Sequence, residues 1–129
     1  MKEEITFKNG DVPLKGTLTK PDTNNPGPVL VVTHTSNDGT RDFGVYQHLA
    51  KFLPPLGIAV FLYDRRGSGE SSGDFATAKF FDLAADAQAA IDYLKVRSDI
   101  DPKRIGVWGM SQGGWIAPLA ATKSSGVAC

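Results

Sequence analysis

The residues best suited to chemistry lie in the segment 104–118, RIGVWGMSQGGWIAP. Within it, Gly109, Ser111 and Gly113 have the spacing G-x-S-x-G, with an apolar strand before the motif and a helix-compatible run after it. In this context a sharp turn exposes a nucleophilic serine, and the flanking glycines let the strand and the helix approach each other. The pattern predicts that Ser111 attacks a carbonyl carbon and that the backbone N–H of Gln112 points to the resulting oxyanion.

Composition predicts a single globular domain, residues 1–129, and argues against several classes of partner. The chain has 14 basic and 14 acidic residues, with both signs interspersed, and 41% of it is hydrophobic. No apolar run approaches the roughly 18 residues that cross a bilayer. We therefore expect neither a nucleic-acid nor a membrane partner. The single cysteine, Cys129, and the charged first residues favour a cytoplasmic location.

No pattern predicts a metal or a cofactor. Two histidines and one cysteine give no cluster of metal ligands. Gly67, Gly69 and Gly73 follow an apolar run, as they do in a dinucleotide-binding loop. Ser72, however, stands where that fingerprint needs a glycine, and no helix opens directly from the loop. We interpret this segment as a glycine-rich turn packed beside the G-x-S-x-G segment.

Hydrophobic periodicity predicts the elements that must position the serine. Alternating apolar residues on both sides of Asn9-Gly10 indicate two strands joined by a tight turn. Further strands are expected at 29–32, 58–63 and 105–108, helices at 41–53, 81–97 and 111–122, a turn at 99–102 and the start of another strand at 127–129. This alternation predicts an α/β fold with a mostly parallel sheet, an N-terminal antiparallel hairpin and helices on both faces.

Four segments resemble the N-terminal half of an α/β hydrolase, nearest to the bacterial esterase and serine-peptidase-like branch related to dienelactone hydrolases. They are 14–21, LKGTLTKP; 34–36, HTS; 63–71, YDRRGSGES; and 101–118, which contains the serine. Together they extend over essentially the whole chain, and the last is the most distinctive. The resemblance implies an α/β-hydrolase sheet that stops before the last strands of the family.

The resemblance implies acyl transfer to water. Ser111 would attack an ester, thioester or amide carbonyl and form an acyl-enzyme, with a small-molecule ester or a short peptide as substrate. In this fold the triad acid and histidine follow the serine along the chain, and we expect both to be missing from these residues. His34 and His48 are poor substitutes for that base, so the chain alone should turn over little substrate. The open sheet edge is expected to favour homo-oligomers.

The loops around the serine receive roles from the same resemblance. The segment 34–36 takes the place of the family's oxyanion loop, with Thr35 where the family has glycine. By position, the Ser36 N–H is expected to pair with the Gln112 N–H as an oxyanion donor. His34, Asp64 and Arg66 are interpreted as residues that shape these loops.

Other side chains receive structural interpretations. We expect Arg65 and Arg66 to anchor their loop through ion pairs. Trp108 and Trp115 are expected to pack in the strand and the helix rather than to bind substrate. The main alternative to an enzyme is a non-catalytic module of the same fold that binds an acyl ligand or a protein partner. The reactivity of Ser111 separates these two functions.

Overall fold

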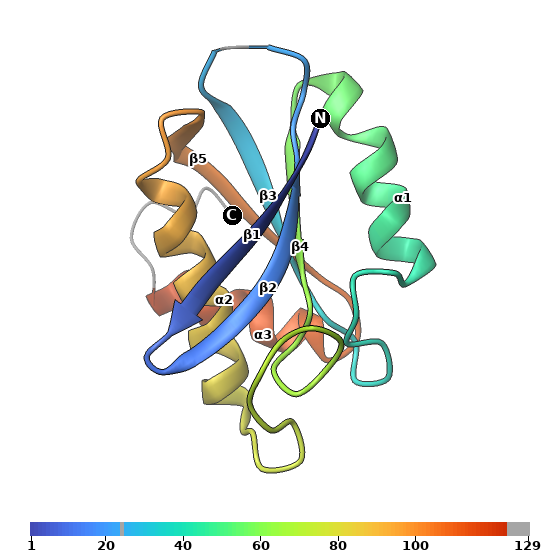
Figure 1. Cartoon of the computed structure of the whole chain (residues 1–129), viewed down its shortest axis with the longest axis vertical. Coiled ribbons are helices and arrows are strands. Elements are labelled where there is room, and N and C mark those ends of the chain that lie inside the picture. The colour runs from blue at the N-terminus through green and yellow to red at the C-terminus, as the bar shows by residue number, and fades with distance from the viewer. Residues whose placement is uncertain (24, 124–129) are drawn as a thin grey trace.

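A five-stranded sheet with helices on both faces forms the protein (Figure 1). The structure, a computed structural model, describes residues 1–23 and 25–123. Its elements are β1 (Lys2–Asn9), β2 (Val12–Thr19), β3 (Gly27–Thr33), α1 (Gly44–Phe52), a 3₁₀ turn (Pro54–Leu56), β4 (Ala59–Tyr63), α2 (Phe80–Lys95), β5 (Ile100–Gly109) and α3 (Gly113–Lys123). The strand order is β1-β2-β4-β3-β5. The predicted α/β fold is confirmed.

The sheet combines an antiparallel hairpin with three parallel strands. β1 pairs with β2 around Gly10, whose φ of 58° suits a tight hairpin turn. β2 joins the rest of the sheet by pairing antiparallel to β4. β3 lies between β4 and β5 and is parallel to both, so the carboxyl ends of these three strands meet at one edge of the sheet. Ligands bind at this edge in open α/β sheets.

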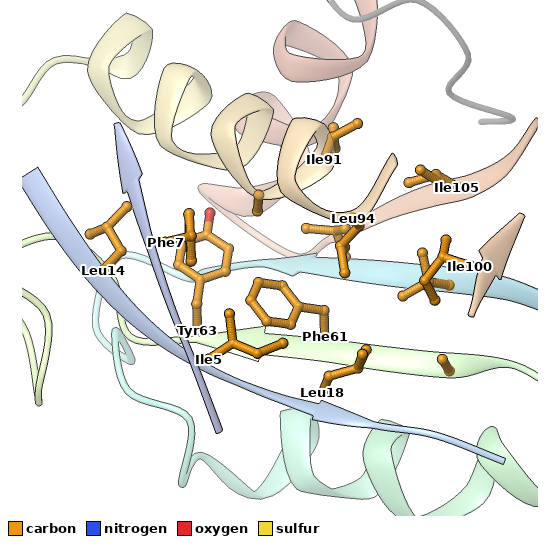
Figure 2. Close-up of a cluster of buried hydrophobic side chains, with 14 residues drawn as sticks. Ile5, Phe7, Leu14, Leu18, Phe61, Tyr63, Ile91, Leu94, Ile100 and Ile105 are labelled. Carbon is orange, nitrogen blue, oxygen red and sulfur yellow. The ribbon is translucent and has the colours of Figure 1, made fainter. Parts of the chain in front are cut away.

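The two faces of the sheet have separate apolar cores. Side chains alternate along β4, so Phe61 and Tyr63 belong to the cluster under α2, whereas Val60 and Leu62 belong to the cluster under α1. Figure 2 shows the larger cluster, to which α2 contributes Ile91 and Leu94, with Leu94 close to Phe61 of the sheet. Strands buried on both faces explain the unbroken apolar runs in the sequence.

Element boundaries differ from the sequence prediction at two informative places. β5 begins at Ile100, within the segment 99–102 that was predicted to be a turn. Ile100 is 2% exposed and pairs with Gly27 next to an irregularity in the β3–β5 register, so strand pairing overrides the local turn signal of Asp-Pro. α3 begins at Gly113 rather than at Ser111, because Ser111 has a left-handed backbone. The strand predicted at 127–129 lies outside the described residues.

The helices of the described residues are all too short or too polar to span a bilayer. Within the same part of the chain, no strand pairs with the outer edge of β5.

The open edge of β5 leads to a prediction about association. Unpaired N–H and C=O groups of an edge strand are a template for pairing with another chain. We expect the weight-average mass in sedimentation experiments to rise with protein concentration toward that of a dimer. A single monomer boundary at the highest concentrations would contradict this expectation.

Candidate active site

Ser111 lies at the apex of the turn between β5 and α3, and it is exposed. Its φ of 58° makes it the one non-glycine residue with a positive φ among those that the structure describes. The turn is closed by the N–H of Gly113, which donates to the Met110 carbonyl at 3.0 Å, and by the N–H of Gly114, which donates to the Ser111 carbonyl at 3.0 Å. A serine in this backbone region costs about 1–2 kcal/mol, so surrounding contacts must hold it there.

Two glycines and a buried threonine supply those contacts. A Cβ at Gly109 would overlap the Gly113 carbonyl oxygen, and a Cβ at Gly113 would lie 2.7 Å from the carbonyl oxygen of Thr33. The Thr33 hydroxyl lies 2.9 Å from the Trp108 carbonyl oxygen and 3.0 Å from that of Gly113. Thr33 therefore ties the end of β3 to both sides of the turn. Sequence reasoning missed it, because nothing in the pattern separates it from an ordinary strand threonine.

The segment 34–36 follows β3, the strand that pairs with β5, and begins next to the point where β5 ends. Thr33 is paired with Gly109 in the β3–β5 register, so the loops that carry Ser36 and Gln112 start from adjacent strand ends. Among residues 1–23 and 25–123, no acceptor takes a hydrogen bond from the N–H of Ser36 or of Gln112. Both amides thus have no protein acceptor within the described residues, which an oxyanion donor requires.

The threonine at position 35 gives this loop a fixed turn of its own. Its N–H donates to the Tyr46 hydroxyl at 2.8 Å. Its hydroxyl oxygen accepts a hydrogen bond from the N–H of Asp38 at 3.1 Å. Thr35 has no positive φ, so the loop does not need the glycine that is usual in the family.

His34 is buried beneath the loop. Its Nε2 lies 2.5 Å from the carbonyl oxygen of Tyr63, and its ring packs edge-on against the rings of Tyr63 and Tyr46. Burial lowers the pKa of His34 from 6.5 to about 4. The ring is therefore neutral near pH 7, with a proton on Nε2 that it donates to Tyr63. His34 thus binds the backbone of β4 and has no hydrogen bond to Ser111.

Asp64 organises the loop after β4. Its buried carboxylate accepts hydrogen bonds from the N–H of Arg41 at 2.9 Å, from Arg41 Nε at 3.1 Å and from the N–H of Glu70 at 2.8 Å. Gly69, with a φ of 53°, backs this carboxylate, and a Cβ there would overlap it. Arg41 was predicted only as the start of a helix. Its partners come from distant segments, so no local pattern could indicate them.

Arg66 and Arg65 are adjacent in the sequence and differ in their partners. Arg66 forms a two-pronged ion pair with Asp86 of α2, through Nε at 2.8 Å and Nη2 at 2.7 Å. This pair raises the pKa of Arg66. Arg65 makes no ion pair with a carboxylate in the described part of the chain, so that expectation was wrong for it. It binds backbone carbonyls instead, and its guanidinium lies 3.5 Å from the centre of the Phe75 ring.

The two tryptophans also differ. Trp108 packs against the cluster under α1, with its ring edge-on to Tyr46, as predicted. Trp115 is 75% exposed, so its expected packing is not found within the described residues. Met110, next to Ser111 in the chain, is also exposed, at 40%.

A general base for Ser111 is not found in this part of the chain. No side chain among the described residues makes a hydrogen bond to its hydroxyl. The sequence after Ser111 contains no Asp, Glu or His. Among the described residues, no three His, Cys, Asp or Glu side chains are grouped to hold a metal ion.

Comparison with known proteins identifies the family. The profile of the family described as serine aminopeptidase, S33, matches residues 25–128. The chain belongs to this family of α/β hydrolases. It is 33% identical over 126 residues to the thiohydrolase apmlB of Arthrinium phaeospermum, covering 94% of this chain and 39% of that protein. It is 31% identical over 114 residues to the quorum-quenching protein AidA of Acinetobacter baumannii, covering 86% and 36%.

Solved structures of this hydrolase fold agree with the same assignment. The α/β hydrolase GrgF from Penicillium sp. sh18 superposes with a TM-score of 0.88 at 27% identity, covering 99% of this chain and 44% of that one. Est1E from Butyrivibrio proteoclasticus, solved with ferulic acid bound, gives 0.83 at 25% identity, covering 92% and 47%. This chain spans less than two fifths of the length of each of these two relatives, 39% of apmlB and 36% of AidA.

The steric role of the glycines leads to a matched pair of substitutions. Gly113→Ala should lower the free energy of unfolding by about 1–3 kcal/mol, because the new methyl group meets the backbone of Thr33. Gly114→Ala should be neutral or stabilising by up to about 1 kcal/mol, because nothing lies within 4 Å of its Cβ and alanine favours the helix. Urea unfolding measures both. Equal effects would contradict the proposed close approach.

The buried His34 leads to a pH dependence. Because its folded pKa of about 4 lies below its ordinary 6.5, the unfolded chain takes up the proton first as the pH falls. The free energy of unfolding should therefore decrease by about 2 kcal/mol from pH 7 to pH 5. His34→Asn should lose this decrease, and His48→Asn, a change at an exposed helix position, should retain it. Urea unfolding at the two pH values tests this, and a wild-type stability that does not change would contradict it.

Proposed function

We propose that Ser111 is the nucleophile of a serine hydrolase that acts on an ester, thioester or amide carbonyl. The observation that carries this proposal is the exposed, left-handed Ser111 in a turn without room for side chains at 109 and 113. Backbone strain of this kind gathers at functional sites, because it persists only where the surroundings enforce it. Membership of a hydrolase family supports the same conclusion.

In the proposed reaction, Ser111 Oγ attacks the carbonyl carbon, and its proton passes to a histidine. The amides of Ser36 and Gln112 donate to the oxyanion of the tetrahedral intermediate. The bond to the leaving group then breaks, the leaving group takes the proton, and the acyl-enzyme is hydrolysed by water. His34 is unsuitable as the base, because its Nε2 is bound to Tyr63 and its pKa is low. We therefore assign the base and the acid to residues outside this chain.

The substrate is proposed to be a small-molecule ester or thioester, or a short peptide, with an apolar acyl group. An apolar hollow of about 340 Å³ lies beside Gln112. It is lined by Phe75, Ala78, Lys79, Phe80, Leu83 and Gln112. Gln112 directly follows the nucleophile, so we propose this hollow as the place for the acyl group of a bound substrate.

A non-catalytic module of the same fold is the second candidate. The observation that favours it is that no side chain among the described residues makes a hydrogen bond to the Ser111 hydroxyl. Such a module would bind an acyl ligand or a protein partner and would leave the serine unmodified.

Labelling with a fluorophosphonate distinguishes the two candidates. We expect one covalent adduct, located on Ser111 by peptide mass spectrometry and lost in Ser111→Ala. Labelling should be slow, because a site without its full triad retains only about 10³–10⁴-fold catalysis over water. Ser36→Ala is the matched control and should still be labelled, since only the backbone of Ser36 is required. A folded chain without an adduct, or with an adduct elsewhere, would refute the proposed mechanism.

A further inference from the structure

The buried side chain of Arg65 lies behind the candidate oxyanion loop. Arg65 directly follows Asp64 at the end of β4, is 7% exposed and donates its backbone N–H to the Gly39 carbonyl at 2.7 Å. Its Nη1 donates to the Thr35 carbonyl at 2.7 Å and is 3.2 Å from that of Ser36. This buried guanidinium has no carboxylate partner in the described part of the chain and binds loop carbonyls instead. Its effect must therefore be sought in the peptide groups to which those carbonyls belong.

Peptide geometry connects the Thr35 carbonyl to the Ser36 amide. The C=O of Thr35 and the N–H of Ser36 belong to the same peptide group, and the described chain has no cis peptide. In a trans peptide these two groups point in opposite directions. By holding the carbonyl, Arg65 turns the N–H of Ser36 away from itself. The preceding peptide is held as well, since the Thr35 N–H donates to Tyr46 at 2.8 Å.

Arg65 also faces the second candidate donor residue. Its Nε and the Oε1 of Gln112 are buried atoms without a hydrogen-bond partner in the described part of the chain. Both side chains line one cavity of about 10 Å³, together with His34 and Asp86. This volume suits a single water molecule. The unpartnered donor of Arg65 and the unpartnered acceptor of Gln112 thus belong to side chains that line the same small cavity.

We propose that Arg65 is a positioning residue that orients and polarises the Ser36 amide as an oxyanion donor, an inference that rests on the proposed function of Ser111. A charged donor on the carbonyl polarises the whole peptide group and makes its N–H a stronger donor. The charge of the guanidinium also favours negative charge on the other side of this peptide. Phe75 stacks on the guanidinium and helps to keep it in place.

Arg65→Met tests this role, with Arg104→Met as the matched control. The methionine at position 65 fills similar space without a charge or a donor, whereas Arg104→Met makes the same change at an exposed arginine that pairs with Asp101. We expect Arg65→Met to slow fluorophosphonate labelling of Ser111 by at least about tenfold, toward the loss caused by deleting an oxyanion donor. It should also move the Ser36 amide ¹⁵N resonance upfield, because the hydrogen bond to the preceding carbonyl is lost. Arg104→Met should retain the resonance and the labelling rate.

Arg65→Lys, which keeps the charge and one donor, should give intermediate values and carries the test if Arg65→Met does not fold. An unchanged Ser36 resonance, or an unchanged labelling rate despite that shift, would overturn the proposal. A wild-type chain that is never labelled would refute the function proposed for Ser111. The ¹⁵N measurement would then still decide whether Arg65 holds the Ser36 peptide, so the two failures are distinguishable.

Discussion

The close approach of β3, β5 and α3 at Gly109 and Gly113 is the constraint on which the candidate site depends. Thr33 contacts the backbone on both sides of the turn through one hydroxyl. With no space for a Cβ at either glycine, the chain reverses so tightly that Ser111 takes a left-handed backbone. The exposure of the serine therefore results from steric packing beneath it, and within the described residues its hydroxyl makes no hydrogen bond that would hold the turn.

Buried polar groups, rather than apolar side chains, hold the loops around this turn. Asp64 and Asp86 are both buried, and each is bound by an arginine and by further N–H donors. A buried carboxylate without such partners would destabilise the fold by several kcal/mol. Each pair joins a segment near the site to a distant one: Arg41 connects the loop after β3 with Asp64, and Arg66 connects the loop after β4 with α2. The strand ends are therefore held together by directional contacts.

The apolar core and the candidate site occupy different parts of the fold. The larger apolar cluster lies between the sheet and α2, well supplied with large side chains from β1, β2 and β4. The candidate site lies at the carboxyl ends of β3, β4 and β5, and the oxyanion donors proposed for it are backbone amides. In such a site the chemistry depends on how the peptides are oriented. A buried histidine and a buried arginine bind backbone carbonyls there.

Local patterns were sufficient for the hairpin, the three buried strands, the three helices and the position of Ser111. Hydrophobic periodicity reports which face of an element is buried, and the two glycines of G-x-S-x-G report a steric requirement that is local to the turn. The start of β5 was mispredicted, because pairing of Ile100 with Gly27 is a contact between distant segments.

Only the tertiary structure decided the partners of the polar side chains. Arg65 and Arg66 are identical neighbours, yet one binds carbonyls of the loop after β3 and the other binds Asp86. Arg41, Thr33 and Tyr46 likewise acquire their roles from groups that the fold brings next to them. A sequence determines where a charge or a hydroxyl stands along the chain. Which acceptor it meets depends on strand order and crossover packing, because hydrogen bonds act over a few ångströms in space and are indifferent to separation in sequence.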